Sequence, residues 1–136
     1  MKTKSILLKT AVGILCAFCV VTSATTFSQA SSYTAYSLGR NKTNNFTSMH
    51  EKTTSDNYIS NQVTAITNTS YANFWAVNNK KSRISSKYKQ GVGTGSCKLI
   101  FTSSDYDKEG TQVGMGMEDY QIHFDYAFVS GTVDFR

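Results

Sequence analysis

The chain has 136 residues and a formal net charge of +5, with 17% charged and 40% hydrophobic residues and no proline. This length allows one domain at most, and the lack of proline excludes collagen-like and proline-rich linker proteins. Eight Tyr, eight Phe and one Trp exclude a plain disordered tail, because such tails lack the aromatic residues that build a core.

Residues 1–30 have the pattern of a secretory signal peptide. Three lysines precede an apolar run over residues 11–21, and a polar stretch then ends in Ser28-Gln29-Ala30. A basic start, a short apolar core and small residues at −3 and −1 predict cleavage after Ala30, with Ala24 as second choice. The alternative is an uncleaved anchor, but the run is shorter than the about 20 residues that span a bilayer. We therefore expect a secreted protein with one domain, residues 31–136.

That domain separates its charges along the chain. Nine basic and two acidic residues lie between positions 31 and 100, whereas seven acidic and two basic residues follow. Cys97 is its single cysteine, so no internal disulfide is expected and stability must rest on the core.

Short strands separated by polar turns account for most of this domain. β-branched and aromatic residues lie between clusters of Gly, Asn and Ser, and helical periodicity is weak. About seven short strands predict an all-β fold, a small antiparallel β-sandwich. In chain order the predicted strands cover residues 33–38, a short stretch near Phe46 within the polar loop 40–57, then 58–67, 71–77, 83–89, 97–102, 113–117 and one or two strands within 120–135.

Two of these segments support sharper predictions. Residues 71–77 are apolar at odd and even positions alike, so we expect a central strand with Trp75 buried. Large apolar residues occupy even-numbered positions from Tyr120 to Phe128 and odd-numbered positions from Val129 onward. This switch predicts a bulge or a turn near Ala127.

Three short motifs resemble an uncharacterised family of small exported proteins of Gram-positive bacteria, often encoded near ABC transporters. They are Asn73-Phe74-Trp75-Ala76-Val77, Gly91-Val92-Gly93-Thr94-Gly95 and Val129-Ser130-Gly131-Thr132-Val133-Asp134, in the order and spacing of that family. The family has no established activity, so the resemblance implies a secreted β-rich domain and nothing catalytic. Bacteriocins of the lactococcin sort are more remotely similar.

The two histidines form the strongest candidate for a metal or acid–base site. His123 and Asp125 share a face if they lie on a strand, and His50 lies beside Glu51. Their spacing is not that of a strong zinc motif, and a solvated strand face is the favoured interpretation. We therefore expect no metal and no cofactor.

Cys97 and the glycine-rich segment 91–95 have plain structural interpretations. Cys97 shares parity with Leu99, which favours a buried small hydrophobe over a nucleophile of a hydrolase or sortase-like transpeptidase. A phosphate-binding loop requires a following helix, whereas a predicted strand follows residues 91–95, so we expect a β-turn.

Five cations without an acid occupy residues 80–89, and Arg83, Lys87 and Lys89 among them share one strand parity. Such clusters bind phosphate-rich polymers through release of condensed counterions. Near an exported bacterial protein, anionic cell-wall polymers and lipid head groups come ahead of nucleic acid as partners. A merely solvated hairpin is the alternative. The candidate ligand-binding residues are Lys80, Lys81, Arg83, Lys87 and Lys89.

These observations predict a small exported, non-enzymatic protein that acts by binding at the bacterial cell envelope, without stable membrane insertion after cleavage. The alternative is a bacteriocin-like secreted toxin. A small enzyme that uses Cys97 or His123 comes third.

Overall fold

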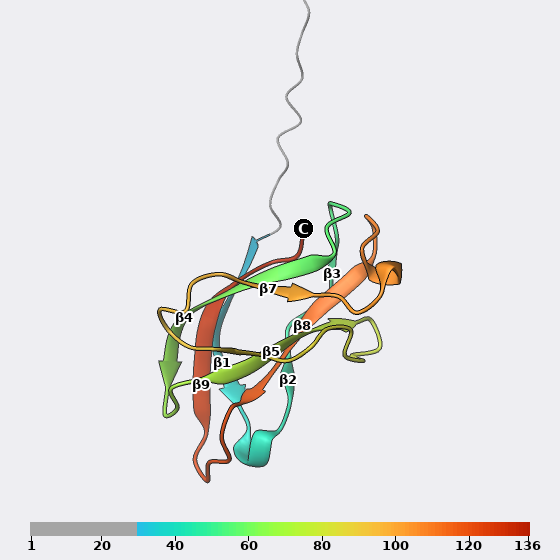
Figure 1. Cartoon of the computed structure of the whole chain (residues 1–136). Coiled ribbons are helices and arrows are strands. Elements are labelled where there is room, and N and C mark those ends of the chain that lie inside the picture. Colours follow the sequence, from blue (N-terminus) through green and yellow to red (C-terminus); the bar gives the residue numbers. More distant parts are fainter. Residues whose placement is uncertain (1–29) are drawn as a thin grey trace, which may run out of the picture.

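The computed structural model describes residues 30–136, which form β-strands joined by turns and loops (Figure 1). The all-β prediction is confirmed, with nine strands instead of about seven. Apart from Ala30, the predicted helical signal peptide lies outside the described residues. The strands are β1 Ala30–Leu38, β2 Asn45–Phe46, β3 His50–Glu51, β4 Tyr58–Thr67, β5 Ala72–Asn78, β6 Tyr88–Gln90, β7 Cys97–Ile100, β8 Gln112–Asp119 and β9 Ala127–Asp134; the 3-10 turns are η1 Arg40–Lys42 and η2 Ser104–Tyr106.

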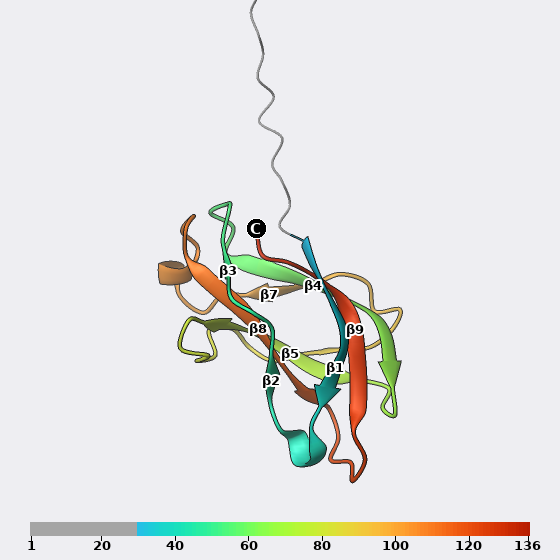
Figure 2. The ribbon, with the colours of Figure 1, turned by 180° about the vertical axis from the view of Figure 1, so that it is seen from behind.

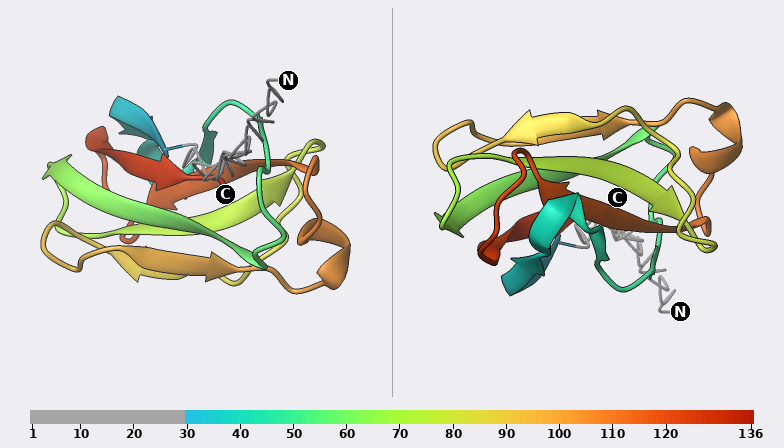
Figure 3. Two further views of the ribbon diagram at one scale, coloured as in Figure 1. Left: turned by 90° about the horizontal axis from the view of Figure 1, so that it is seen from above. Right: turned by 90° about the horizontal axis from the view of Figure 1, so that it is seen from below.

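The strands form two antiparallel sheets. Sheet 1 has the order β1-β9-β4-β7, and sheet 2 has the order β2-β8-β5-β6. β3 also pairs with β8, so β2 and β3 together make an interrupted edge, which Figure 2 shows from behind. Views along the vertical axis show strands of the two sheets stacked against one another (Figure 3).

The two sheets share one apolar core. Alternate residues of β9 are buried, and alternate residues of β8 and β5 enter the same cluster from sheet 2, because successive side chains of a strand point to opposite faces. Burial of this apolar surface is the main force that holds the sheets together. The largest contributions come from Leu38, Ile59, Phe74, Leu99, Val113, Met115, Met117, Val129 and Phe135.

A buried chain of hydrogen bonds also joins the sheets. The Tyr33 hydroxyl of β1 donates to Asn61 Oδ1 of β4 at 2.9 Å, and Asn61 Nδ2 donates to Gln90 Oε1 of β6 at 2.6 Å. Gln90 Nε2 returns a bond to the Asn61 carbonyl oxygen at 3.1 Å. Burial raises the pKa of the Tyr33 phenol. Since an unpaired buried polar group costs about 1–3 kcal/mol, this chain disfavours other alignments of the sheets.

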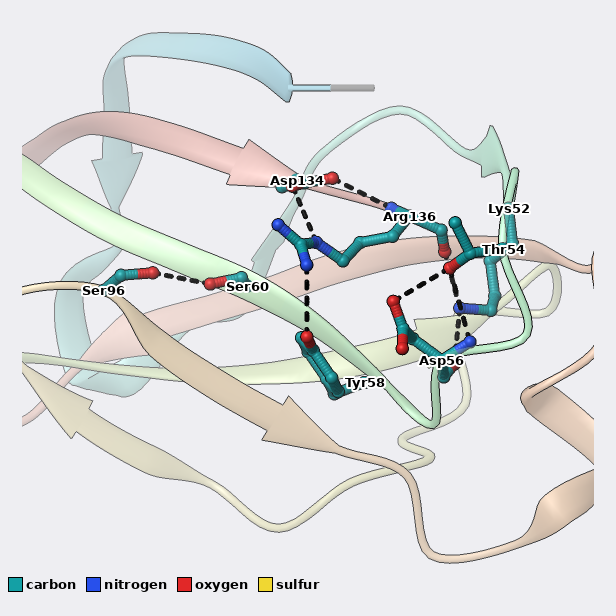
Figure 4. A network of polar contacts seen from close by, with 8 residues as sticks. All are labelled: Lys52, Thr54, Asp56, Tyr58, Ser60, Ser96, Asp134 and Arg136. Atoms are coloured by element: carbon teal, nitrogen blue, oxygen red, sulfur yellow. Dashed lines mark hydrogen bonds and ion pairs between the residues drawn. The ribbon is translucent and has the colours of Figure 1, made fainter. Parts of the chain in front are cut away.

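Lys52 is buried, although it lies in the segment predicted to be a polar loop. Its Nζ donates to the main-chain oxygens of Asp56 at 2.7 Å and Arg136 at 2.6 Å, as Figure 4 shows. The Arg136 guanidinium in turn contacts Asp134 Oδ2 at 2.8 Å and donates to the Tyr58 hydroxyl at 3.2 Å. Burial lowers the pKa of the Lys52 ammonium. This network attaches Arg136 to the segment before β4.

Two predicted strands are partly wrong. Within residues 83–89, only Tyr88 and Lys89 belong to a strand, while Arg83 and Ser85 make single bridges. Within 120–135 the strand starts at Ala127, where the parity switch was predicted, and residues 120–126 form a loop. The chain leaves sheet 2 at the end of β8 and enters sheet 1 at β9, so this loop must cross between the layers.

Trp75 is buried in a central strand, as predicted, with 3% of its surface exposed. Its ring, however, lies on the outer face of sheet 2, because the neighbouring Phe74 and Ala76 point into the shared core. Gly116 is its cross-strand partner, and a Cβ there would overlap the indole. Phe46 pairs with Gly116 from the other side and lies edge-on to the indole, with ring centroids 6.4 Å apart.

We expect Gly116→Ala to lower the free energy of unfolding by about 1–3 kcal/mol, the usual range for overpacking. The new methyl group must displace the rigid indole. Urea denaturation followed by the fluorescence of Trp75, the one tryptophan of the chain, measures the loss. The emission of the folded variant should also shift to the red, because the ring becomes more exposed.

Gly114→Ala is the matched control on the same face of β8. Its Cβ would overlap the end of the Met49 side chain, which is flexible and able to move aside. Equal losses in the two variants would contradict the role assigned to the contact between Gly116 and Trp75.

Candidate functional site

The predicted basic cluster lies on a turn and on the adjoining edge of sheet 2. Asn78 ends β5, and its side-chain oxygen accepts hydrogen bonds from the main-chain N–H groups of Lys80 and Ser82, both at 3.0 Å. The chain then bridges back to β5 and enters β6. All five predicted residues are exposed: Lys80, Lys81, Arg83, Lys87 and Lys89.

Strand pairing places three of these cations on the outer face. Arg83 pairs with Val77 and Lys89 pairs with Asn73, and both partners occupy outward positions of β5. Lys87 precedes β6, and its contacts with the Trp75 ring and Glu118 place it on the same face. The structure thus places Arg83, Lys87 and Lys89 on one face, as their shared parity in the sequence predicted. Lys80 lies on the turn.

A shallow groove of about 350 Å³ lies between these cations and the rings of Trp75 and Phe46 on the outer face of sheet 2. Lys87 Nζ is 4.7 Å from the centroid of the Trp75 ring, and Lys81 Nζ is 5.3 Å from that of Phe46. An ammonium group at such a distance is attracted to the ring face, so the rings position both head groups. We call this the cationic groove; its lining is Asn44, Phe46, Trp75, Lys81, Arg83 and Lys87.

Glu118 corrects the expectation of a cluster without an acid. It lies on β8, and its Oε1 contacts Lys87 Nζ at 2.8 Å and accepts a hydrogen bond from Asn73 Nδ2 at 3.0 Å. The carboxylate is almost fully buried, so it neutralises Lys87 locally. Among residues 30–136, Lys81, Arg83 and Lys89 have no such acidic partner.

A second hollow, of about 480 Å³, adjoins Lys89. Lys89 Nζ lies 4.1 Å from the centroid of the Tyr71 ring and 4.0 Å from that of Tyr120. His123 also lines it, and its Nε2 is buried without a hydrogen-bond partner among the described residues. We call this the tyrosine pocket; its lining is Asn68, Thr69, Ser70, Tyr71, Lys89, Tyr120, Gln121 and His123.

The sequence held only part of the signal for these two hollows. The shared parity of the cations was visible, but the aromatic walls come from β2, β5, the turn before β5 and the segment after β8. Long-range strand pairing brings these segments together, and no local pattern encodes that pairing.

The two histidines lie far apart. His50 is on β3 and His123 is in the loop after β8, at opposite ends of the molecule (Figure 1). His50 stacks on the Phe135 ring with centroids 4.1 Å apart, and burial lowers the pKa of its imidazole. In the part of the chain that the structure describes, no three His, Cys, Asp or Glu residues are close enough to hold a metal ion.

Cys97 begins β7 and is half-buried against the core on the same side as Leu99. Burial raises the pKa of its thiol, which favours the protonated form over the nucleophilic thiolate. The glycine-rich segment forms the predicted turn, and β7 follows it in place of a helix.

The chain matches no protein-family model, and no curated protein and no solved structure is significantly similar to it. Within residues 30–136 there is no helix with the length and apolar character needed to cross a bilayer.

We expect His50 to make the stability of the fold depend on pH. Its pKa is lowered in the folded state, so below about pH 6.5 the unfolded chain binds more protons than the folded chain. The free energy of unfolding should therefore fall as pH decreases from about 6.5 through the folded pKa. Urea denaturation at a series of pH values measures this decline.

His50→Phe keeps an aromatic ring for stacking on Phe135 but removes the titrating group. The variant should lose less stability than the wild type over the same pH range. Identical pH profiles for the two proteins would show that His50 contributes nothing to the decline.

Proposed function

We propose that the chain is a small exported, non-enzymatic β-sandwich protein that binds an anionic, phosphate-rich polymer of the bacterial cell envelope. The outer face of sheet 2 is the binding surface. Three cations without an acidic partner among the described residues carry the proposal: Lys81, Arg83 and Lys89 share one face beside two hollows.

The geometry suits a linear polyanion better than a single small anion. The cationic groove and the tyrosine pocket are separate hollows, and Lys87 lines the first while Lys89 lines the second. Lys87 immediately precedes β6 and Lys89 lies within it, so the two hollows are close together along one segment. A chain with repeating phosphates is able to contact both hollows at once, and each contact releases a condensed counterion.

The aromatic rings keep the cations in place without neutralising them. The ammonium groups of Lys81 and Lys89 lie over ring faces, so they retain their full charge toward solvent. Ring contacts also restrict the flexible lysine stems, which reduces the entropy lost when a ligand binds. Lys87 has a different role, because Glu118 already balances it and its stem covers Trp75.

We expect the double variant Lys81→Gln/Arg83→Gln to bind inorganic polyphosphate more weakly than the wild type. The slope of log K against log salt should become shallower by about 1.4, since each lost phosphate contact removes about 0.7 for a single-stranded polyanion. Titration at several salt concentrations measures affinity and slope, and binding to isolated cell walls should fall in parallel.

Lys98→Gln/Lys108→Gln is the matched control, because it removes the same charge from exposed positions outside both hollows. This control should keep the wild-type slope. Equal weakening in the two double variants would mean that only net charge matters. Binding by the wild type that does not depend on salt would exclude a polyanion site on this face.

A further inference from the structure

The loop between β8 and β9 forms one end of the molecule. In Figures 1 and 2 it lies at the lower end, together with η1 and the turn between β4 and β5, whereas the start of β1 and the C-terminus lie at the upper end. Large apolar side chains occupy its alternate positions. We call these four residues the apolar tip: Tyr120, Ile122, Phe124 and Tyr126.

The apolar tip is exposed, although its alternating pattern predicts a strand with one buried face. Ile122 is 66% and Phe124 86% exposed, and Tyr126 is 50% exposed. Isolated exposed apolar residues are ordinary, but several of them together on one loop mark a contact surface.

Hydrogen bonds hold both ends of the loop, so only its middle projects. The Tyr120 N–H donates to the Tyr71 carbonyl oxygen at 3.3 Å, and Asn68 Nδ2 donates to the Tyr126 carbonyl oxygen at 2.9 Å. Thus the turn between β4 and β5 holds the loop at both of its ends. Ile122 and Phe124 are the most exposed of these side chains, which suits a deformable or flat partner.

Cations flank the apolar tip. The Arg40 guanidinium lies 5.1 Å from the centroid of the Tyr126 ring, and Lys42 follows in the same 3-10 turn. Both side chains are exposed, and neither forms an ion pair within residues 30–136. The acidic groups at this end are Asp125 and the buried Asp119, which accepts hydrogen bonds from Thr69 and the Gln121 N–H. Lys89, beside the Tyr120 ring, is a third cation, so three positive charges face two negative ones. The rim of the tip is therefore net positive.

We infer that the apolar tip inserts into the interfacial region of an anionic phospholipid bilayer and binds the protein peripherally to it. Ile122 and Phe124 enter the acyl boundary, and Tyr126 stays at the level of the head groups, where amphipathic rings are favoured. Arg40 and Lys42 face the lipid phosphates, and each such cation adds to the attraction of an anionic membrane surface. This surface is distinct from the cationic groove.

The test is cosedimentation of the protein with vesicles of equal parts phosphatidylglycerol and phosphatidylcholine. We expect the wild type to bind, and Ile122→Ser/Phe124→Ser to reduce the partition coefficient about tenfold or more, since two apolar side chains no longer leave water. Lys42→Gln should weaken binding to these vesicles. Val92→Ser is the matched control, because Val92 is 58% exposed on the separate turn before β7, and it should bind like the wild type.

Phe124→Trp provides a second measurement in a protein that keeps the apolar tip. Its emission should shift to the blue when vesicles are added, while Trp75 is already buried and contributes a constant background. Polyphosphate binding by Ile122→Ser/Phe124→Ser should equal that of the wild type, so this inference and the proposed function fail independently.

Three results would overturn the inference. One is absence of wild-type binding to the anionic vesicles. Another is wild-type binding by Ile122→Ser/Phe124→Ser. The third is a dimer in vesicle-free solution that this double variant abolishes, which would make the tip a contact between two copies of the chain.

Discussion

The missing side chain at Gly116 decides how the outer face of sheet 2 is built. Because β8 has no Cβ there, the Trp75 indole lies over the strand and becomes buried without entering the core. The buried ring then supports Phe46 on one side and the stem of Lys87 on the other. The cationic groove is what remains between this aromatic cover and the cations beside it, so its shape depends on one glycine in the middle of the sheet.

Antiparallel pairing between β5 and β8 sorts the basic cluster into residues with different roles. The register sets Asn73 opposite Glu118, and the buried carboxylate reaches Lys87. A buried charge needs such a partner, so Lys87 belongs to the structure of the face. Lys81 and Arg83 have no acidic partner within residues 30–136 and stay exposed, which leaves their charge available to a ligand.

The two proposed surfaces adjoin at one residue. Tyr120 contacts Lys89 in the tyrosine pocket and also begins the loop that carries the apolar tip. A protein with both surfaces would contact an anionic polymer with one face and a phospholipid bilayer with the adjoining end. The chemistry of the surfaces differs, because phosphate contacts weaken with salt whereas insertion of Ile122 and Phe124 depends on apolar area.

The sequence by itself determined the all-β class, the central strand around Trp75, the turn at residues 91–95 and the common face of Arg83, Lys87 and Lys89. Each of these follows from local alternation or local turn chemistry, which neighbouring residues encode. Tertiary structure alone decided the partnership of Glu118 with Lys87, the burial of Lys52 and the exposure of Ile122, Phe124 and Tyr126. The alternation of Tyr120, Ile122 and Phe124 indicates that these side chains lie on one side of the segment. It does not indicate whether another part of the protein packs against that side. The crossing from sheet 2 to sheet 1 places Ile122 and Phe124 beyond the edge of the core, and both remain largely exposed, whereas Tyr120 packs against Tyr71 and Lys89.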